Sequence, residues 1–172
     1  MSTGTTGRLL VRPLAPGDDH AAVGRLVQDG YFGLPGYPHD DEYDDEIARV
    51  AARGDGSLVV VAELDGAIVG CLTYAAHHTM ADAEHDDPAA ATFRYFAVSP
   101  AVQGRGVGEA MVRWVFERAR ADGKRRIHIH TLVVMVGAQR LYERLGFVRH
   151  PEGDAEWDGV VGLAYLADVP PA

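Results

Sequence analysis

One stretch of this chain constrains its fold more than any other: residues 92–108, which read TFRYFAVSPAVQGRGVG. It begins with a buried strand, Phe93 to Val98, and breaks at Ser99-Pro100. A glycine-rich loop, Gln103 to Gly108, then leads directly into an amphipathic helical pattern from Glu109 to Ala121. Glycines let the backbone approach an anion, and the first turn of a helix leaves its N–H groups free to bind one. The stretch therefore predicts a phosphate-binding loop.

Two common nucleotide-binding loops do not fit these residues. The P-loop requires a lysine and a serine or threonine after its last glycine, where this chain has Glu109 and Ala110. The dinucleotide pattern G-x-G-x-x-G, started at Gly104 and Gly106, places its third glycine on Glu109. A charged side chain there opposes a pyrophosphate. The pattern that remains is Q-x-x-G-x-G after V-S-P.

This loop resembles the pyrophosphate loop of the GNAT superfamily of acyl-CoA-dependent N-acyltransferases, which reads Q/R-x-x-G-x-G/A. A second block, residues 138–147 (AQRLYERLGF), is similar to the C-terminal signature of the same family. The resemblance covers roughly Leu9 to Leu166, and its specific motifs lie between Thr92 and Phe147. It implies an N-acetyltransferase that moves an acetyl or other short acyl group from acyl-CoA to a primary amine by direct attack. A non-catalytic acyl-CoA-binding sensor is the alternative.

The resemblance also implies how acetyl-CoA, the expected co-substrate, is held. The backbone of Phe96, Ala97 and Val98 pairs with the pantetheine arm, and the N–H near Val98 is the expected oxyanion donor. The loop amides cradle the diphosphate, and the residues concerned are Gln103, Gly104, Arg105, Gly106, Val107, Gly108 and Glu109. An ordinary core strand with a tight turn is the alternative, but glycines are costly in backbone entropy unless close approach is needed.

Acyl transfer to an amine further needs a proton donor for the thiolate and a base for the amine. By resemblance Tyr142 is the general acid, because a phenol with a pKa near 10 is protonated at neutral pH; a packing aromatic is the alternative. Thr92 occupies the position of the family's usual glutamate base. A second carboxylate position of the family falls on His130, whose imidazole suits proton abstraction unless it merely faces solvent. Met135 replaces an asparagine that binds the cofactor in many members.

The alternation of strands and helices predicts an α/β fold, and the resemblance implies a GNAT-like mixed, mostly antiparallel sheet with helices on both faces. We expect a flexible tail at residues 1–7 and one acyltransferase domain at 8–172. Apolar alternation predicts strands at 9–13, 58–64, 67–75, 93–98, 127–132, 147–149 and 160–167. Helical periodicity predicts helices from a cap at Asp18 to near Gly30, and at 40–53, 109–121 and 137–145.

Composition narrows the possible partners. The chain has 172 residues, 47% of them hydrophobic, and a net charge of −9, which argues against nucleic-acid binding. Residues 1–91 hold 5 basic and 16 acidic side chains, a net −11, and residues 92–172 hold 11 basic and 9 acidic, a net +2. The second half thus suits a polyanionic cofactor, whereas the acidic half favours a cationic acceptor or simply keeps the protein soluble. No apolar run reaches the length of a membrane span, and no signal peptide is evident. The lone cysteine, Cys71, is expected in the core. These observations together favour a cytoplasmic protein.

The sequence does not identify the acceptor beyond a small-molecule or peptide amine. A run of acids at a helix start is able to attract a cation, although helix capping explains it equally well: Asp40, Asp41, Glu42, Asp44 and Asp45. The histidines in the loop at residues 77–91 match no known ligand spacing, so no metal is expected. Homodimers are common in the family, but these residues do not fix the oligomeric state.

Overall fold

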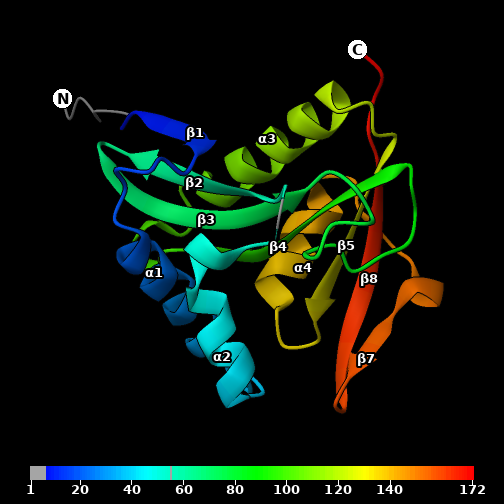
Figure 1. Cartoon of the computed structure of the whole chain (residues 1–172), viewed down its shortest axis with the longest axis horizontal. Helices are drawn as coiled ribbons and strands as arrows, with labels where there is room; N and C mark the ends of the chain where they lie inside the picture. Colours follow the sequence, from blue (N-terminus) through cyan, green and yellow to red (C-terminus); the bar gives the residue numbers. More distant parts are fainter. Residues whose placement is uncertain (1–6, 55) are drawn as a thin grey trace.

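The structure is a computed structural model that describes residues 7–54 and 56–172, so the predicted tail lies outside the described residues except for Gly7. Its strands are β1 (Leu9–Pro13), β2 (Leu58–Leu64), β3 (Ala67–Ala75), β4 (Ala90–Val98), β5 (Arg126–Leu132), β6 (Val148–Arg149), β7 (Ala155–Trp157) and β8 (Val160–Asp168). They pair in the order β1-β2-β3-β4-β5-β8-β6, with β7 beside β8 (Figure 1). All pairs are antiparallel except β4–β5, which confirms the predicted mixed, mostly antiparallel sheet.

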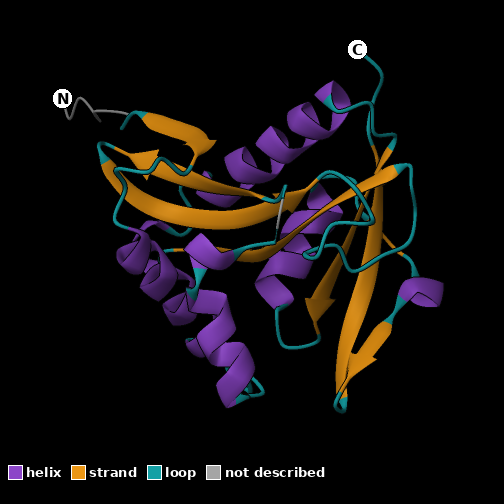
Figure 2. Cartoon of the chain, in the orientation of Figure 1, coloured by secondary structure: helices purple, strands orange, loops and turns teal. Residues whose placement is uncertain are grey.

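Helices cover both faces of the sheet (Figure 2): α1 (His20–Phe32), α2 (Asp41–Ala48), α3 (Val107–Ala121) and α4 (Val136–Arg144). Alternate residues of a strand point to opposite faces. On β2, Val60 therefore joins a core with Met111 of α3, and Val61 joins a second core with Ile47 of α2. Cys71 is buried in that second core, as predicted, and burial raises the pKa of its thiol to about 12. Within the described residues, no helix combines the length and the apolar character that crossing a bilayer requires.

The first two helices differ from the sequence expectation at their ends. Asp19, not Asp18, caps α1, because the carboxylate of Asp18 instead binds Arg12 at 2.8 Å. The helix then continues past Gly30 to Phe32.

Helix α2 is shorter than the predicted 40–53 and is followed by one 3₁₀ turn, Val50–Ala52. The guanidinium of Arg53 donates to the carbonyls of Glu46 and Ile47, both at 2.8 Å, and so satisfies the end of the helix. Between β6 and β8, where no strand was predicted, the chain also forms the short strand β7.

The two halves of the sheet separate between β4 and β5. These parallel strands pair at Ala90 with Arg126 and at Ala91 with Ile127, and they diverge beyond those pairs (Figure 1). On its other edge β4 stays paired with β3 as far as Val98, which lies opposite Gly70. The edge of β4 that faces β5 therefore presents backbone groups to an opening rather than to a neighbouring strand.

A bulge interrupts β4 at this opening. Thr73 of β3 lies opposite Arg94, but Cys71 lies opposite Ala97, so β4 contains one extra residue. Tyr95 adopts a φ of +52°, a conformation that costs about 1–3 kcal/mol for a residue other than glycine. Its ring is buried, and its hydroxyl donates to Glu46 at 2.7 Å, so the tertiary structure holds the bulge in place.

Strand β5 carries histidines on one face. Ile127 and Ile129 lie in the core with α3, as the alternation predicts, while His128 and His130 point the other way and their ring centroids lie 5.2 Å apart. The ring of His128 also stacks on His85 at 5.2 Å. Burial, together with the neighbouring imidazoles, lowers the pKa of His128 to about 4.

This pKa predicts an acid-sensitive stability. The unfolded chain protonates His128 below its ordinary pKa of 6.5, whereas the folded protein does so only near pH 4. Stability is therefore lost as the pH falls from 6.5 towards 4, by roughly 2–3 kcal/mol from this group. Urea unfolding at pH 7 and pH 4.5 measures the loss. The His128→Gln variant is expected to lose less stability than the parent, and the His20→Gln variant, at a partly exposed position, as much as the parent. An undiminished loss in His128→Gln would contradict the prediction.

Candidate active site

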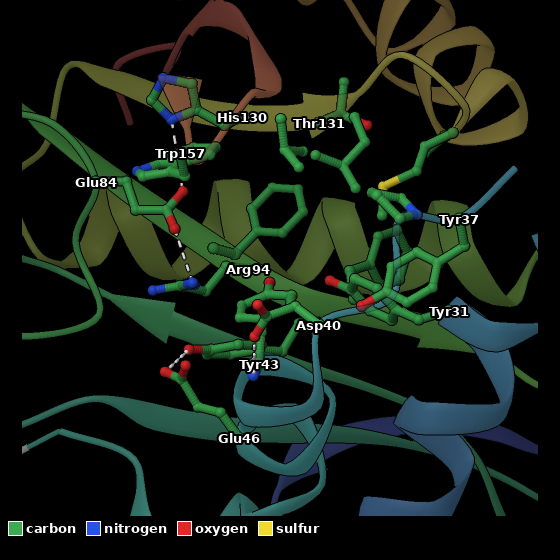
Figure 3. A pocket seen from close by; sticks show the side chains of 18 of the residues that line it. Tyr31, Tyr37, Asp40, Tyr43, Glu46, Glu84, Arg94, His130, Thr131 and Trp157 are labelled. Carbon is green, nitrogen blue, oxygen red and sulfur yellow. Dashed lines mark hydrogen bonds and ion pairs between the residues drawn. The ribbon is translucent and has the colours of Figure 1, made fainter. Parts of the chain in front are cut away.

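A cavity of about 730 Å³ lies where β4 and β5 diverge. Residues from α1 and α2 and the segment between them form one wall, β4 forms another, and β5, α4 and the β7–β8 hairpin complete it. Figure 3 shows the labelled tyrosines of the α1–α2 side across from His130 of β5. Three of the site residues predicted from the sequence line this cavity: Phe96 of β4, Tyr142 of α4 and His130 of β5.

The loop, the strand and α4 meet at Gly108. A Cβ added there would lie 3.3 Å from Leu141, 3.5 Å from Phe96 and 3.8 Å from Val98. A side chain at this position would press on Leu141 and touch β4, so Gly108 marks the place where α3 packs closely against β4 and α4. The structure thus brings the predicted strand and the predicted loop next to the helix that carries Tyr142.

The other two loop glycines have a different role. Gly104 and Gly106 both have a φ of +79°, and a Cβ on either would meet no atom within 4 Å. They face open space in a conformation that favours glycine. Helix α3 begins right after Gly106, and no side chain caps this end, so its first N–H groups are available to an anion. The side chain of Glu109 pairs with Arg113 at 2.8 Å and lies 3.9 Å from Arg144, both on the helices beside the loop.

Tyr142 lies in an aromatic cluster at the wall of the cavity. Its ring centroid is 5.8 Å from that of Phe93 and 5.5 Å from that of Phe147, and burial raises its pKa well above the ordinary 10. The phenol is therefore protonated across the physiological pH range. The neighbouring Tyr165 gives its hydroxyl to Glu143 at 3.2 Å, whereas none of the hydrogen bonds in the described part of the chain engages the Tyr142 hydroxyl.

His130 lies on the β5 side of the cavity, opposite the labelled tyrosines of the α1–α2 side, and belongs to a charged cluster (Figure 3). Its Nε2 is 2.8 Å from the carbonyl oxygen of Gly153, and its Nδ1 is 3.6 Å from Glu84. Glu84 in turn pairs with Arg94 at 2.8 Å. Burial alone would lower the pKa of His130, but Glu84 and the Gly153 carbonyl outweigh it and raise the pKa above 6.5. Both ring nitrogens face acceptors, which favours the protonated imidazole.

Sequence reasoning missed Glu84 and Arg94. Glu84 belongs to the segment before β4 that was expected to be a loop, and Arg94 appeared as one residue of a buried strand. Their pairing depends on a contact between the loop and the bulged strand, and no local pattern reports it. Thr92 is buried on β4 opposite Ala75, and Met135 lines the cavity while packing against the core of α1 and α2.

The acids of α2 have structural roles. Asp40 caps the helix by accepting from the N–H of Tyr43 at 2.9 Å. Asp44 accepts from the Tyr37 hydroxyl at 2.8 Å and lies 2.8 Å from His39. Helix capping therefore accounts for Asp40, and contacts with the segment between α1 and α2 account for Asp44. Among the described residues, no three His, Cys, Asp or Glu side chains are arranged to hold a metal ion.

Comparison with known proteins adds the following. Residues 22–147 match the model of the Acetyltransferase (GNAT) family. The N-acetylaspartate synthetase of Rattus norvegicus is 33% identical over 112 residues, which make up 65% of this chain and 34% of that protein. The chain thus spans about a third of the length of the synthetase.

Solved structures share the whole fold. A GCN5-related N-acetyltransferase from Kribbella flavida matches with a TM-score of 0.71 at 23% identity, over 93% of this chain and 97% of that one. The structure of yncA from Salmonella typhimurium, solved with its cofactor acetyl-CoA, matches with a TM-score of 0.63 at 17% identity, over 95% of both chains. At these identities the likeness establishes the fold.

Proposed function

Since this chain belongs to the GNAT acetyltransferase family, we propose that it transfers the acetyl group of acetyl-CoA to a primary amine. The observation that carries the proposal is the open edge of β4, which lies between an uncapped glycine loop and Tyr142. In the proposed complex the pantetheine arm lies along β4 from Phe96 to Val98. The diphosphate lies on the amides of residues 104–109, where the exposed Gly104 and Gly106 leave room for it. The acetyl group then enters the cavity.

The backbone of β4 supports the predicted oxyanion donor. The N–H of Ser99 donates to Val69 of β3 at 2.7 Å. Successive N–H groups along a strand point to opposite edges, so the N–H of Val98 points away from β3, towards the opening. In acyl-transfer enzymes the loss of one such donor costs about 3 kcal/mol of transition-state stabilisation.

The proposed reaction is a direct displacement. The amine nitrogen forms a bond to the thioester carbonyl carbon, the carbon–sulfur bond breaks, the nitrogen loses one proton and the coenzyme A thiolate gains one. Tyr142 supplies the proton to the thiolate, because its phenol lines the cavity and is protonated at all relevant pH values. Release of free thiol from acetyl-CoA in the presence of amines tests the proposal, since a sensor that only binds the cofactor releases none.

His130 is our candidate for the base that deprotonates the amine, provided that its imidazole is first neutral. The imidazole accepts a proton only after losing the one that Glu84 and the Gly153 carbonyl help to hold. We therefore expect kcat/KM to rise with pH through a pKa above 6.5. The His130→Gln variant is expected to lose this rise together with about 10-fold or more of activity. A pH–rate profile of the variant that parallels the parent would remove His130 from this role.

The acceptor remains to be identified within the class of small-molecule or peptide amines. The name of the rat relative states that it makes N-acetylaspartate, so amino acids are one class to test here. Polyamines, arylalkylamines, aminoglycosides and peptide N-termini complete a panel for the thiol-release assay. Turnover of any of them supports the proposed function. Binding of acetyl-CoA without turnover of any amine supports the sensor alternative.

A further inference from the structure

A guanidinium group lies in the wall of the cavity. Arg94 lies in the middle of β4, directly before the bulge at Tyr95. Its guanidinium carbon lies 4.2 Å from the centre of the Tyr95 ring, whose hydroxyl is fixed by Glu46. The side chain is 18% exposed, and it contacts Glu84 inside the cavity (Figure 3). The strained bulge therefore holds a cation at a defined place beside the proposed reaction centre.

Arg94 has more donors than described partners. A guanidinium offers five N–H groups in a rigid fork that matches a carboxylate. Glu84 contacts one terminal nitrogen at 2.8 Å, and the Tyr43 hydroxyl also lies beside the guanidinium. The Nε of Arg94 is buried with no hydrogen-bond partner among the described residues. Buried donors without partners are costly, so the free Nε of Arg94 requires an explanation, and a bound ligand is one.

The charge around Arg94 is also incompletely balanced. Among the described residues, Glu84 is the one carboxylate that pairs with Arg94, and it also contacts His130, whose two ring nitrogens both face acceptors. Two basic side chains, Arg94 and His130, therefore share one carboxylate. The other acids that line the cavity are exposed, namely Asp40, Glu42, Glu46 and Asp158. Arg94 and His130 thus lie on the inner wall with Glu84, and the remaining carboxylates of the lining lie towards solvent.

We propose that Arg94 anchors a carboxylate of the acetyl acceptor, so that the preferred acceptors are free amino acids rather than polyamines or arylalkylamines. The inference rests on the proposed acetyl transfer and names its substrate class. It replaces the cationic acceptor that the charge asymmetry of the sequence favoured. In this arrangement the carboxylate binds the donors of Arg94 that Glu84 leaves free, and the amine is directed towards the opening beside Tyr142.

Matched pairs of amines test the anchor. Each L-amino acid is compared with its carboxamide in the thiol-release assay, and L-phenylalanine is further compared with 2-phenylethylamine. The best acceptor is expected to be an amino acid, with kcat/KM at least ~30-fold above that of its amide, in keeping with a lost charge-assisted hydrogen bond. The Arg94→Gln variant is expected to lose ~30-fold with the amino acid and less than ~3-fold with the amide. Arg94→Lys is expected to fall between.

Two further variants separate recognition from folding. The double variant Arg94→Gln with Glu84→Gln removes both charges of the pair and leaves no unpaired carboxylate, so it is expected to show the same selective loss. Arg120→Gln removes an arginine from the outer end of α3 and is expected to change neither member of a pair selectively. Thermal unfolding of each variant establishes that it is folded.

Three results would overturn the inference. One is a best acceptor without a carboxylate, and another is an equal loss for acid and amide in the Arg94→Gln variant. The third is a protein that binds acetyl-CoA but neither binds nor acetylates any amino acid, as measured by calorimetry and thiol release. A protein that fails to bind acetyl-CoA at all would instead overturn the proposed function.

Discussion

Replacement of Tyr142 by phenylalanine is expected to lower kcat by about 100-fold or more and to leave the KM for acetyl-CoA nearly unchanged. The phenol is a protonated group at the wall of the cavity and our proposed proton donor, and without it the thiolate must leave unprotonated or take its proton from another donor. None of the hydrogen bonds in the described residues uses this hydroxyl, so the substitution is expected to leave the folded state intact. Steady-state kinetics with a thiol reagent, together with thermal unfolding, measures both effects.

Tyr165 provides the matched control. Its ring centroid lies 6.3 Å from that of Tyr142 in the same aromatic cluster, but its hydroxyl bonds to Glu143 and its side chain does not line the cavity. Tyr165→Phe is therefore expected to keep kcat within about threefold of the parent. Equal turnover in both variants and the parent would show that Tyr142 only packs. Equal losses in both would point to general disturbance of the cluster.

The second large effect is expected at the loop. Gly106→Val is expected to weaken acetyl-CoA binding by about 100-fold, because the new side chain occupies the open space that the diphosphate needs and removes about two charge-assisted hydrogen bonds. The φ of +79° at this position also strains any other residue by about 1–2 kcal/mol. A titration calorimeter measures the affinity, and urea unfolding measures the strain.

Gly123 separates these two contributions. It follows α3 with a φ of +73°, and a Cβ there also meets no atom within 4 Å. Gly123→Val is therefore expected to lower the free energy of unfolding about as much as Gly106→Val while leaving acetyl-CoA binding unchanged. An unchanged affinity in Gly106→Val would mean that the diphosphate does not lie at this loop.

Sequence alone could predict the parts of this fold that local chemistry determines. Strands β2 and β3 appear with the predicted boundaries because each is a continuous apolar run and Asp65-Gly66 makes a tight turn between them, both residues with positive φ. The fold class, the family and the sites of the loop and of Tyr142 followed from short motifs. These motifs work because glycine conformation and helix N-termini are local properties.

The remaining features depend on contacts between distant segments. The bulge at Tyr95 is stabilised by Glu46 from another element, and no residue near it in the sequence indicates that β4 will be irregular. The pairing of Glu84 with Arg94 joins a loop to that bulge. Helix α2 ends early because Arg53 folds back onto its carbonyls, where a helical period alone predicts continuation. Such features shape the wall of the cavity around Arg94 and His130, and for this reason sequence reasoning did not find the Glu84–Arg94 pair.

The central claim is that acetyl-CoA binds along the open edge of β4 and over the loop before α3. Titration of the isotopically labelled protein with acetyl-CoA, followed by the backbone amide signals in NMR spectra, tests it residue by residue. The account predicts saturable shifts concentrated at residues 96–98 and 104–109, with residues near Gly123 unaffected. Saturable binding that leaves those two segments unchanged, or no shifts at millimolar acetyl-CoA, would contradict it.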